Sequence, residues 1–441
     1  MDAGGSSSDR RRVKSALFVL ACTAAGMAPH WLPPQQSYWP AIALAIVLGG
    51  YSIRTVLLQG QPAPASAPAG SGDGALPAVD VVIAARDEQA VITRLVEHLA
   101  ALRYPSEQLK IWVVDDASSD RTPELLAGLQ QRFAQLQVLQ RPADAGGGKS
   151  GALNTVLQQL QGRWMLVLDA DAQLQNDTLE RLIPYAEAGG WAAVQLRKAV
   201  ANAEVNLLTR AQAMEMALDA VIQQGRLSVG GVAELRGNGQ LLRRDALLAC
   251  GGFNEATVTD DLDLSFRFVV HGQPIGVLWD PPVREEAVLG LGALLRQRQR
   301  WAEGGLQRFF DYGAGLLSDR LKPSQQIDLL CFFLLQYVMP VLAAADLLGA
   351  ALTRTLPCIW PLSIVALGLS GLAIVRGCLR PSEGPALPAM NPLAMALGIV
   401  YLGHWFVVIP WVSVRMALLP KRLVWAKTLH LGEDHEAAAT A

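Results

Sequence analysis

Hydrophobic residues are distributed unevenly along this chain of 441 residues. Long apolar runs lie near both ends, at about 16–28, 38–58, 327–352, 359–375 and 393–418. The run at 38–58 is long enough to cross about 30 Å of hydrocarbon. Residues 79–320 have instead the composition of a soluble domain. The pattern predicts two membrane segments, one large soluble domain and three further membrane segments.

The first apolar run is open to two interpretations. It follows a polar start that ends in a basic cluster at residues 10–14, as the core of a signal peptide does. A hairpin made with the run at 38–58 is the more natural arrangement for two adjacent segments. The basic cluster then places the N-terminus in the cytoplasm, and the hairpin returns the chain to that side.

These patterns divide the chain into seven parts. We expect a polar cytoplasmic N-terminus at 1–14, two transmembrane helices at 15–58, a linker rich in Pro, Ala and Gly at 59–78, a cytosolic domain at 79–303, an interfacial helix region at 304–325, three transmembrane helices at 326–418 and a polar tail at 419–441. The C-terminal part contains a conflict. Three spans put the tail opposite the cytosolic domain, yet Lys421, Arg422 and Lys427 follow the last span, and basic residues favour the cytoplasmic side. An apolar segment that lies at the interface or re-enters the membrane would remove this conflict.

Within the soluble region, segments of strand length alternate with segments of helical periodicity. "VDVVIAA", "LKIWVVDD" and "RWMLVLDADA" are predicted strands, and the stretches between them repeat apolar residues at helical spacing. Alternation of this kind predicts a mostly parallel sheet covered by helices. Ligands of such sheets bind at the carboxyl ends of the strands, where Asp115, Asp116, Asp169 and Asp171 are found.

Composition supports a membrane protein and narrows its partners. Hydrophobic residues make up 51% of the chain and charged residues 17%, against about 25% charged in ordinary soluble domains. The net charge of −2 gives no reason to expect nucleic-acid binding. The five cysteines are scattered without a Cys-x-x-Cys pair, which favours buried, reduced packing residues over a metal site or a disulfide framework.

Two pairs of acids end neighbouring predicted strands. Asp169 and Asp171, in "LVLDADAQL", are able to hold Mg²⁺ or Mn²⁺ and leave positions open for diphosphate oxygens, although the same spacing also occurs in strand-end turns. Asp115 and Asp116, in "WVVDDASSD", are able to accept hydrogen bonds from a uracil imide or from ribose hydroxyls. The alternative for that second pair is a role in capping the next helix.

Two glycine-rich stretches are candidates for contact with a ligand. "AGGGKSGALN" does not fit the ATPase phosphate loop, because Ala143 stands where the first glycine is required, but Lys149 remains suited to an anionic donor. In "LRGNGQLLRRDAL", Gly237 and Gly239 allow close backbone approach to a substrate, and an ordinary turn is the alternative.

The last two motifs are "VTDDLDL" and "QRQRW". Asp260, Asp261 and Asp263 precede a helical run that Thr259 is able to cap, so an acid-rich helix start is one interpretation and an acid/base site is another. Gln297, Arg300 and Trp301 form a Gln-x-x-Arg-Trp array. In that array Arg300 is able to bind diphosphate and the indole offers a flat face to a sugar. A basic helix that touches lipid headgroups is the alternative.

Taken in order from Val79 to Trp301, these motifs resemble those of the membrane-bound family 2 glycosyltransferases. The series is "AARDE", "VVDDASSD", "GGGKSGALN", "LDADA", "GNGQLLRR", "TDDLDL" and "QRQRW". The resemblance implies an α/β nucleotide-sugar-binding domain of the GT-A type with a mostly parallel sheet, joined to a multi-span α-helical membrane region. It also implies an integral multi-pass membrane protein whose catalytic domain is cytoplasmic.

The resemblance also assigns roles to residues. It makes Asp261 the catalytic base, with Asp260 in place of the family's Glu, and it makes Asp263 a helix-start residue. Asp171, with Asp169, matches the ligands of Mg²⁺ or Mn²⁺. The donor-binding residues implied are Asp115, Asp116, Lys149, Asp169 and Arg300, and the acceptor-binding residues are Gly237, Asn238, Gln297 and Trp301.

The stretch "QRQRWAEGGLQRFFDYG", followed by three apolar segments and no further domain, is similar to that of the cyanobacterial β-monoglucosyldiacylglycerol synthases. This similarity implies inverting transfer of glucose from UDP-glucose to 1,2-diacylglycerol. The alternative is a processive β-polysaccharide synthase with a similar layout, whose acceptor is a growing sugar chain. From another class, an inactive sugar-binding scaffold would be expected to have lost acid motifs, and all of them are present here.

Overall fold

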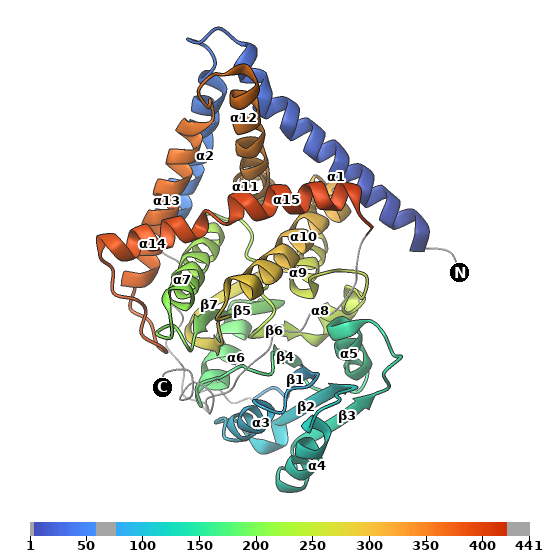
Figure 1. Ribbon diagram of the computed structural model, residues 1–441. Helices are drawn as coiled ribbons and strands as arrows, with labels where there is room; N and C mark the ends of the chain where they lie inside the picture. The colour runs from blue at the N-terminus through green and yellow to red at the C-terminus, as the bar shows by residue number, and fades with distance from the viewer. Residues whose placement is uncertain (1–3, 59–75, 421–441) are drawn as a thin grey trace.

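The computed structural model describes residues 4–58 and 76–420. The expected linker at 59–78 therefore lies mostly outside the described residues. Lys421, Arg422 and Lys427, on which the conflict about the C-terminus rests, lie outside them as well. Figure 1 shows an α/β domain at one end of the molecule and a group of long helices at the other.

The sheet of the α/β domain has seven strands. They are β1 (Val79–Ala85), β2 (Leu109–Asp116), β3 (Leu136–Arg141), β4 (Trp164–Leu168), β5 (Ala193–Val200), β6 (Gln240–Arg243) and β7 (Ile275–Glu285). Their order is β3-β2-β1-β4-β6-β5-β7, and β6 alone pairs antiparallel, with β4 and β5. The predicted mostly parallel sheet is confirmed. Its first two strands have the predicted limits, because both are continuous apolar runs.

Helices cover both faces of this sheet. They are α3 (Ile92–Ala100), α4 (Thr122–Arg132), α5 (Gly148–Leu157), α6 (Thr178–Ala188), α7 (Leu207–Ser228), α8 (Arg244–Ala249) and α9 (Asp260–Val270). Side chains alternate along β1, so Val81 and Ile83 join one core with α3, α4 and α6, whereas Val82 joins the other with α5, α8 and α9. A short 3₁₀ turn, η2 (Ser106–Gln108), leads into β2.

The second group of helices contains the apolar runs. It comprises α1 (Gly4–Met27), the 3₁₀ turn η1 (Ala28–Trp31), α2 (Trp39–Leu57), α11 (Pro323–Phe333), the π-helical segment η3 (Leu334–Val338), α12 (Met339–Thr353), α13 (Trp360–Leu379), α14 (Pro392–Leu402) and α15 (Trp405–Leu418). Five helical stretches in the described chain are long and apolar enough to cross a membrane: Arg10–Trp31, Trp39–Leu57, Pro323–Thr353, Trp360–Leu379 and Pro392–Leu418. The chain is a membrane protein, as the apolar runs predicted.

One of these five stretches is oriented differently from the others. In Figure 1, α14 and α15 run across the direction of α2, α12 and α13, at the level where these helices meet the α/β domain. Trp405 Nε1 donates to Glu215 Oε1 of α7 over 2.9 Å, and Arg415 Nη2 lies 3.3 Å from Glu303 Oε2. The last apolar run is therefore bound to the α/β domain along its length.

Helix α10 (Leu291–Leu316) connects the two parts of the molecule. It is one continuous helix that contains both the Gln-x-x-Arg-Trp array and most of the expected interfacial region. Its contacts reach α9 on one side and α15 on the other. The array is consequently held at the junction between the α/β domain and the membrane helices.

Candidate active site

The acids that the sequence analysis singled out converge at one edge of the sheet. Asp169 and Asp171 follow β4, and Asp260 and Asp261 begin α9. Lys149, in the first turn of α5, places its Nζ 2.5 Å from Asp169 Oδ1. Burial by itself lowers the pKa of Lys149, but the carboxylates of Asp169 and Asp260 raise it above its ordinary value. Lys149 is therefore protonated at neutral pH, and its positive charge lies among the carboxylates.

Asp261 lies at the centre of this group. Burial and the neighbouring charge of Asp260 raise the pKa of Asp261 from 3.8 to about 6, although Lys149 and Arg236 act in the opposite direction. Its own helical turn is fixed, because Ser265 Oγ donates to its backbone carbonyl over 2.8 Å. A carboxylate with a pKa near 6 is still ionised at neutral pH and is a stronger base than an exposed aspartate.

Thr259 does not cap α9 as expected. It stands at the N-cap position, but its side chain makes no cap hydrogen bond, because it packs against α10 instead. Asp263 proves to be structural: it pairs with Arg267 at 2.7 Å and accepts from Asn254 and Tyr312, each at 2.9 Å. Its place on the first turn of α9 agrees with the expectation that it is not a site residue.

The carboxylates expected to hold a metal differ in their surroundings. Asp171 is buried, and its Oδ2 accepts the N–H of Glu286 over 2.9 Å. The Asp169 side chain is 40% exposed, so it faces the open side of the site. Asn238 accepts the backbone N–H of Asp169 over 3.2 Å, and this bond fixes the turn after β4. One anchored and one accessible carboxylate form a donor set that suits a hard divalent cation.

The two acids that end β2 have separate tasks. Asp115 Oδ1 accepts the N–H of Ser118 over 3.1 Å, which fixes the loop after β2 but does not cap α4, a helix that begins only at Thr122. Asp116 forms an ion pair with Arg141, and Arg141 also donates to the Gly146 carbonyl over 2.7 Å. Asp116 therefore braces the glycine-rich loop that leads to Lys149, and its carboxylate is already bound inside the protein.

The array on α10 contains one unpaired cation. Arg300 makes no ion pair or hydrogen bond through its side chain with any residue that the structure describes. Gln297 Oε1, by contrast, accepts from Arg298 over 2.7 Å. The Trp301 ring has Arg298 Cζ 4.0 Å from its centroid and Lys198 Nζ at 5.6 Å. Trp301 thus has a fixed orientation, whereas Arg300 is free to bind an anion.

Sequence reasoning missed Arg298, which fixes this array. It is buried, pairs with Glu215 Oε2 at 2.5 Å and donates to the Tyr401 hydroxyl over 3.0 Å. Its partners lie 83 and 103 positions away in the chain, so no local pattern identifies them. An arginine one residue from an expected ligand was the only signal in the sequence.

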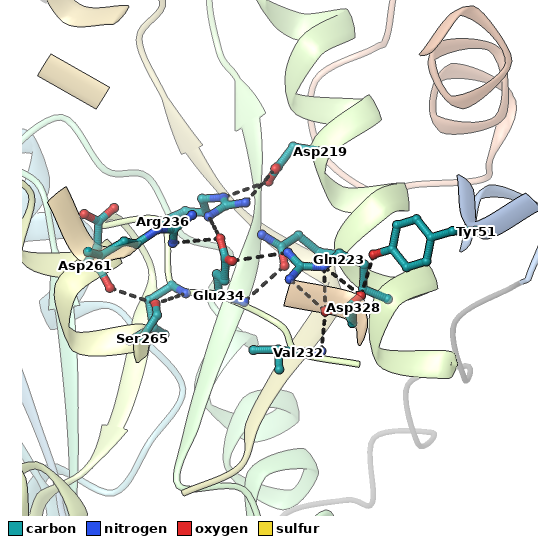
Figure 2. A network of polar contacts seen from close by, with 12 residues as sticks. Tyr51, Asp219, Gln223, Val232, Glu234, Arg236, Asp261, Ser265 and Asp328 are labelled. Atoms are coloured by element: carbon teal, nitrogen blue, oxygen red, sulfur yellow. Dashed lines mark hydrogen bonds and ion pairs between the residues drawn. The ribbon is translucent and has the colours of Figure 1, made fainter. Parts of the chain in front are cut away.

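A second feature that the sequence did not reveal is a buried network of charges (Figure 2). Glu234 has no exposed surface and pairs with Arg226, Arg236 and Arg308 at 2.8–3.3 Å. Burial alone raises the pKa of Glu234, but the three guanidinium groups hold it well below its usual range. The network continues from Arg226 to Asp328 of α11, which accepts the Tyr51 hydroxyl of α2 over 2.5 Å.

This network ties the membrane helices to the turn that carries Gly237 and Asn238. Arg236 pairs with Asp219 of α7 at 3.0 Å, and Leu235 N–H donates to Ser265 Oγ of α9 over 2.8 Å. Figure 2 shows this chain of contacts running from Tyr51 to Asp261. Buried charges of this kind are costly unless all of them are paired, so the network holds the two parts in one arrangement.

A cavity of about 290 Å³ opens from the site into the membrane helices. Its polar end includes Asp261, Lys198, Arg236 and Trp301, together with Glu215, Asp219 and Arg308. Its remaining walls are mainly apolar side chains of α2, η3, α12, α13, α14 and α15, among them Val56, Leu335, Met339, Leu367, Leu369, Leu402 and Phe406. The candidate base is therefore reached from an apolar chamber.

A mostly parallel sheet with acids at the carboxyl ends of its strands, joined to membrane helices, is the arrangement of a membrane-bound glycosyltransferase of the GT-A type, and the comparisons with known proteins agree with it. The chain belongs to the glycosyltransferase-like family 2, whose model matches residues 77–304. It is thus a sugar-transferring enzyme, and the predicted family is confirmed.

Curated relatives extend this likeness to nearly the whole chain. The beta-monoglucosyldiacylglycerol synthase of Synechocystis sp. is 42% identical over 96% of this chain and 89% of its own length. The synthase of the same name from Trichormus variabilis is 40% identical over 96% of this chain and 90% of its own. The mannosyltransferase PcManGT of Pyrobaculum calidifontis, solved with GDP-Man and Mn²⁺, shares the fold with a TM-score of 0.58 at 19% identity. The match covers 92% of this chain and 99% of that one.

Proposed function

We propose that this enzyme transfers one glucose from UDP-glucose to the free hydroxyl of 1,2-diacylglycerol and forms a β-linked monoglucosyl lipid. The observation that carries the proposal is the cavity, which begins at Asp261 and Trp301 and continues between apolar side chains of the membrane helices. Such a chamber suits acyl chains and suits a polar sugar polymer poorly. The names of the Synechocystis and Trichormus relatives support the same acceptor.

The reaction follows from the positions of the side chains. Asp261 takes the proton of the lipid hydroxyl, and the hydroxyl oxygen forms a bond to the anomeric carbon of the sugar. The bond from that carbon to the diphosphate breaks, and its electron pair leaves with UDP. A single displacement of this kind inverts the centre, so an α-linked donor yields a β-linked product. Arg300 and Lys149 bind the diphosphate as it gains charge.

Mg²⁺ or Mn²⁺ belongs to the same proposal. Asp171 and Asp169 fit such a cation, since one carboxylate is anchored by the N–H of Glu286 and the other is accessible. When bound, the cation neutralises charge on the diphosphate. Asp115 remains the candidate for the nucleoside, and Gly237, Asn238, Gln297 and Trp301 remain candidates for the acceptor side.

We propose that the catalytic domain is cytoplasmic and that Pro392–Leu418 lies along the membrane surface. Arg11, from the basic N-terminal cluster, pairs with Asp311 of α10 at 2.7 Å, so that cluster and the catalytic domain lie on the same side. If α14 and α15 do not cross, four spans return the chain to this side. The basic residues after Leu418 then obey the positive-inside rule as well.

The test is an assay of the purified full-length protein in vesicles that contain diacylglycerol, with UDP-glucose or UDP-N-acetylglucosamine as donor. We expect a solvent-extractable lipid that carries a single hexose, as measured by mass spectrometry. The competing polysaccharide synthase predicts a product that lengthens as donor is supplied, and such a product would overturn the proposal.

A further inference from the structure

Several polar side chains of the membrane helices line the cavity, among them Tyr51, Ser52, Thr55, Ser370 and Gln336, and of these Gln336 is the one that carries an amide. Gln336 lies in η3, the π-helical turn between α11 and α12, and lines the cavity. Its side chain is partly buried, and its amide makes no hydrogen bond with any residue that the structure describes. An unpaired amide among membrane helices is costly, and π-helical turns occur frequently at functional sites.

Two glycines of α10 bring this turn close to the catalytic turn. A Cβ atom on Gly305 would lie 1.9 Å from the Tyr337 hydroxyl, and a Cβ atom on Gly304 would lie 2.0 Å from Thr259 Oγ1. Tyr337 follows Gln336 in η3, and Thr259 precedes the Asp260–Asp261 pair. Side chains of the π-helical turn and of the residue before α9 therefore pack against neighbouring glycines of α10. The cavity that Gln336 lines is the one that Asp261 closes.

The polar groups of diacylglycerol, the proposed acceptor, give a reason for the Gln336 amide in the cavity. When the free hydroxyl of a diacylglycerol is at Asp261, its remaining polar groups are two ester linkages, whose carbonyl oxygens accept hydrogen bonds and donate none. The Gln336 side chain offers two N–H donors. Beyond the esters the lipid is hydrocarbon, and the side chains of α12 and α13 that line the cavity are apolar apart from Ser370.

We propose that Gln336 donates a hydrogen bond to an ester carbonyl of the acceptor and selects ester-linked over ether-linked glycerol lipids. This inference rests on the proposed function, because it takes diacylglycerol to be the acceptor. Gln336 is then a specificity-determining residue: it contacts the ester of the acceptor, whereas Asp261 contacts the reacting hydroxyl.

The experiment compares two acceptors with identical chains, 1,2-dioleoylglycerol and its dialkyl ether analogue, in the full-length enzyme. We expect the wild type to favour the ester by about 3- to 10-fold in kcat/KM, in line with the net effect of one neutral hydrogen bond. Q336M, which keeps the length of the side chain and removes the amide, is expected to bring this ratio to about 1 by losing activity on the ester alone. Q336L serves as a second variant, and binding of UDP checks that both variants are folded.

Q326M is the matched control, since it makes the same substitution on α11 at a side chain that donates to Ser318 O over 2.8 Å and does not line the cavity. Its ester-to-ether ratio should equal that of the wild type. An unchanged ratio in folded Q336M and Q336L would overturn the inference while leaving the proposed function standing. If the wild type glycosylates neither lipid and yields polymer instead, the proposed function fails first, and this inference fails with it.

Discussion

Gly237 lies so close to the carboxylate of Asp261 that a Cβ atom on the glycine would be 3.3 Å from Oδ2 of the aspartate, closer than an ordinary van der Waals contact. The glycine also has φ +86°, a conformation that residues with a side chain rarely adopt. The "GNG" turn therefore leaves room for the candidate base, and the space beside Asp261 is set by the backbone of a different segment.

G237A is the first test of this relationship. We expect it to lower kcat at least 10-fold, because the new methyl group crowds the carboxylate. An alanine at a positive φ also strains the backbone, so this effect must be measured apart from crowding of the carboxylate. Gly251 provides the control, since it has φ +83° and nothing lies within 4 Å of its Cβ position. G251A should lose stability to a similar extent and keep its kcat. Equal kcat values in the two variants would contradict the argument.

Asp261 should govern both the rate and its pH dependence. D261N is expected to lower kcat about 10²–10⁴-fold, the usual contribution of a general base, while binding of the nucleotide sugar persists. With a pKa of about 6, the wild-type base is protonated at low pH. The value of kcat/KM should therefore rise from pH 5 to pH 7 with a midpoint near 6 and then level off. A rate that is flat across this range would assign the base to another group.

The raised pKa of Asp261 also affects stability: whereas the rate should rise with pH, the contribution of Asp261 to stability should fall as pH rises. Asp261 has a folded-state pKa raised above 3.8, so the stability it contributes is present below about pH 4 and is lost as pH rises through about 6. D261N cannot ionise and avoids that loss. Thermal unfolding at pH 7.5 should show the variant at least as stable as the wild type, and a clearly lower midpoint would mean that the substituted amide disturbs the site.

Divalent cations should be required. EDTA is expected to abolish transfer, and Mg²⁺ or Mn²⁺ should restore it, because Asp169 and Asp171 offer carboxylates next to the diphosphate position. D169N should raise the concentration of Mg²⁺ needed for half-maximal activity, since this carboxylate is the accessible one of the pair. Full activity in excess EDTA, after removal of bound metal, would rule out this role.

Glu234 should be among the most sensitive positions for stability. E234Q leaves Arg226, Arg236 and Arg308 without their shared anion in a buried place, and loss of one partner of a buried pair costs about 3–5 kcal/mol. Thermal unfolding in detergent measures this loss. E204Q is the control, because Glu204 pairs with Arg210 at the surface, where such a pair contributes at most about 1 kcal/mol. Similar losses in both variants would contradict the network.

The glycine pair of α10 should be intolerant of side chains. G304A forces α10 away from Thr259 and is expected to cost about 1–3 kcal/mol and to lower activity. Gly313 lies on the same helix with nothing within 4 Å of its Cβ position, so G313A should instead stabilise by up to about 1 kcal/mol. Unfolding midpoints of the two variants measure the difference, and a change of the same sign in both would argue against close packing at Gly304.

The sequence by itself was sufficient for features that depend on local pattern. The long apolar helices, the first strands and the acids at strand ends are all encoded in neighbouring residues, because hydrophobic periodicity reports which faces are buried. The motif series identified the family for the same reason, since the spacing of "DAD", "TDD" and "QRQRW" is itself local.

Only the tertiary structure decided which charges meet and what surrounds them. Asp116, expected at the donor, is bound to Arg141, and Trp301 is fixed by Arg298, to which the motif had assigned no role. Ion pairs such as Arg226 with Asp328 join residues about a hundred positions apart, and their energies depend on burial that no single segment determines. The apolar cavity also depends on tertiary packing, since helices from both ends of the chain and α7 and α10 from its middle have to pack together before the cavity exists.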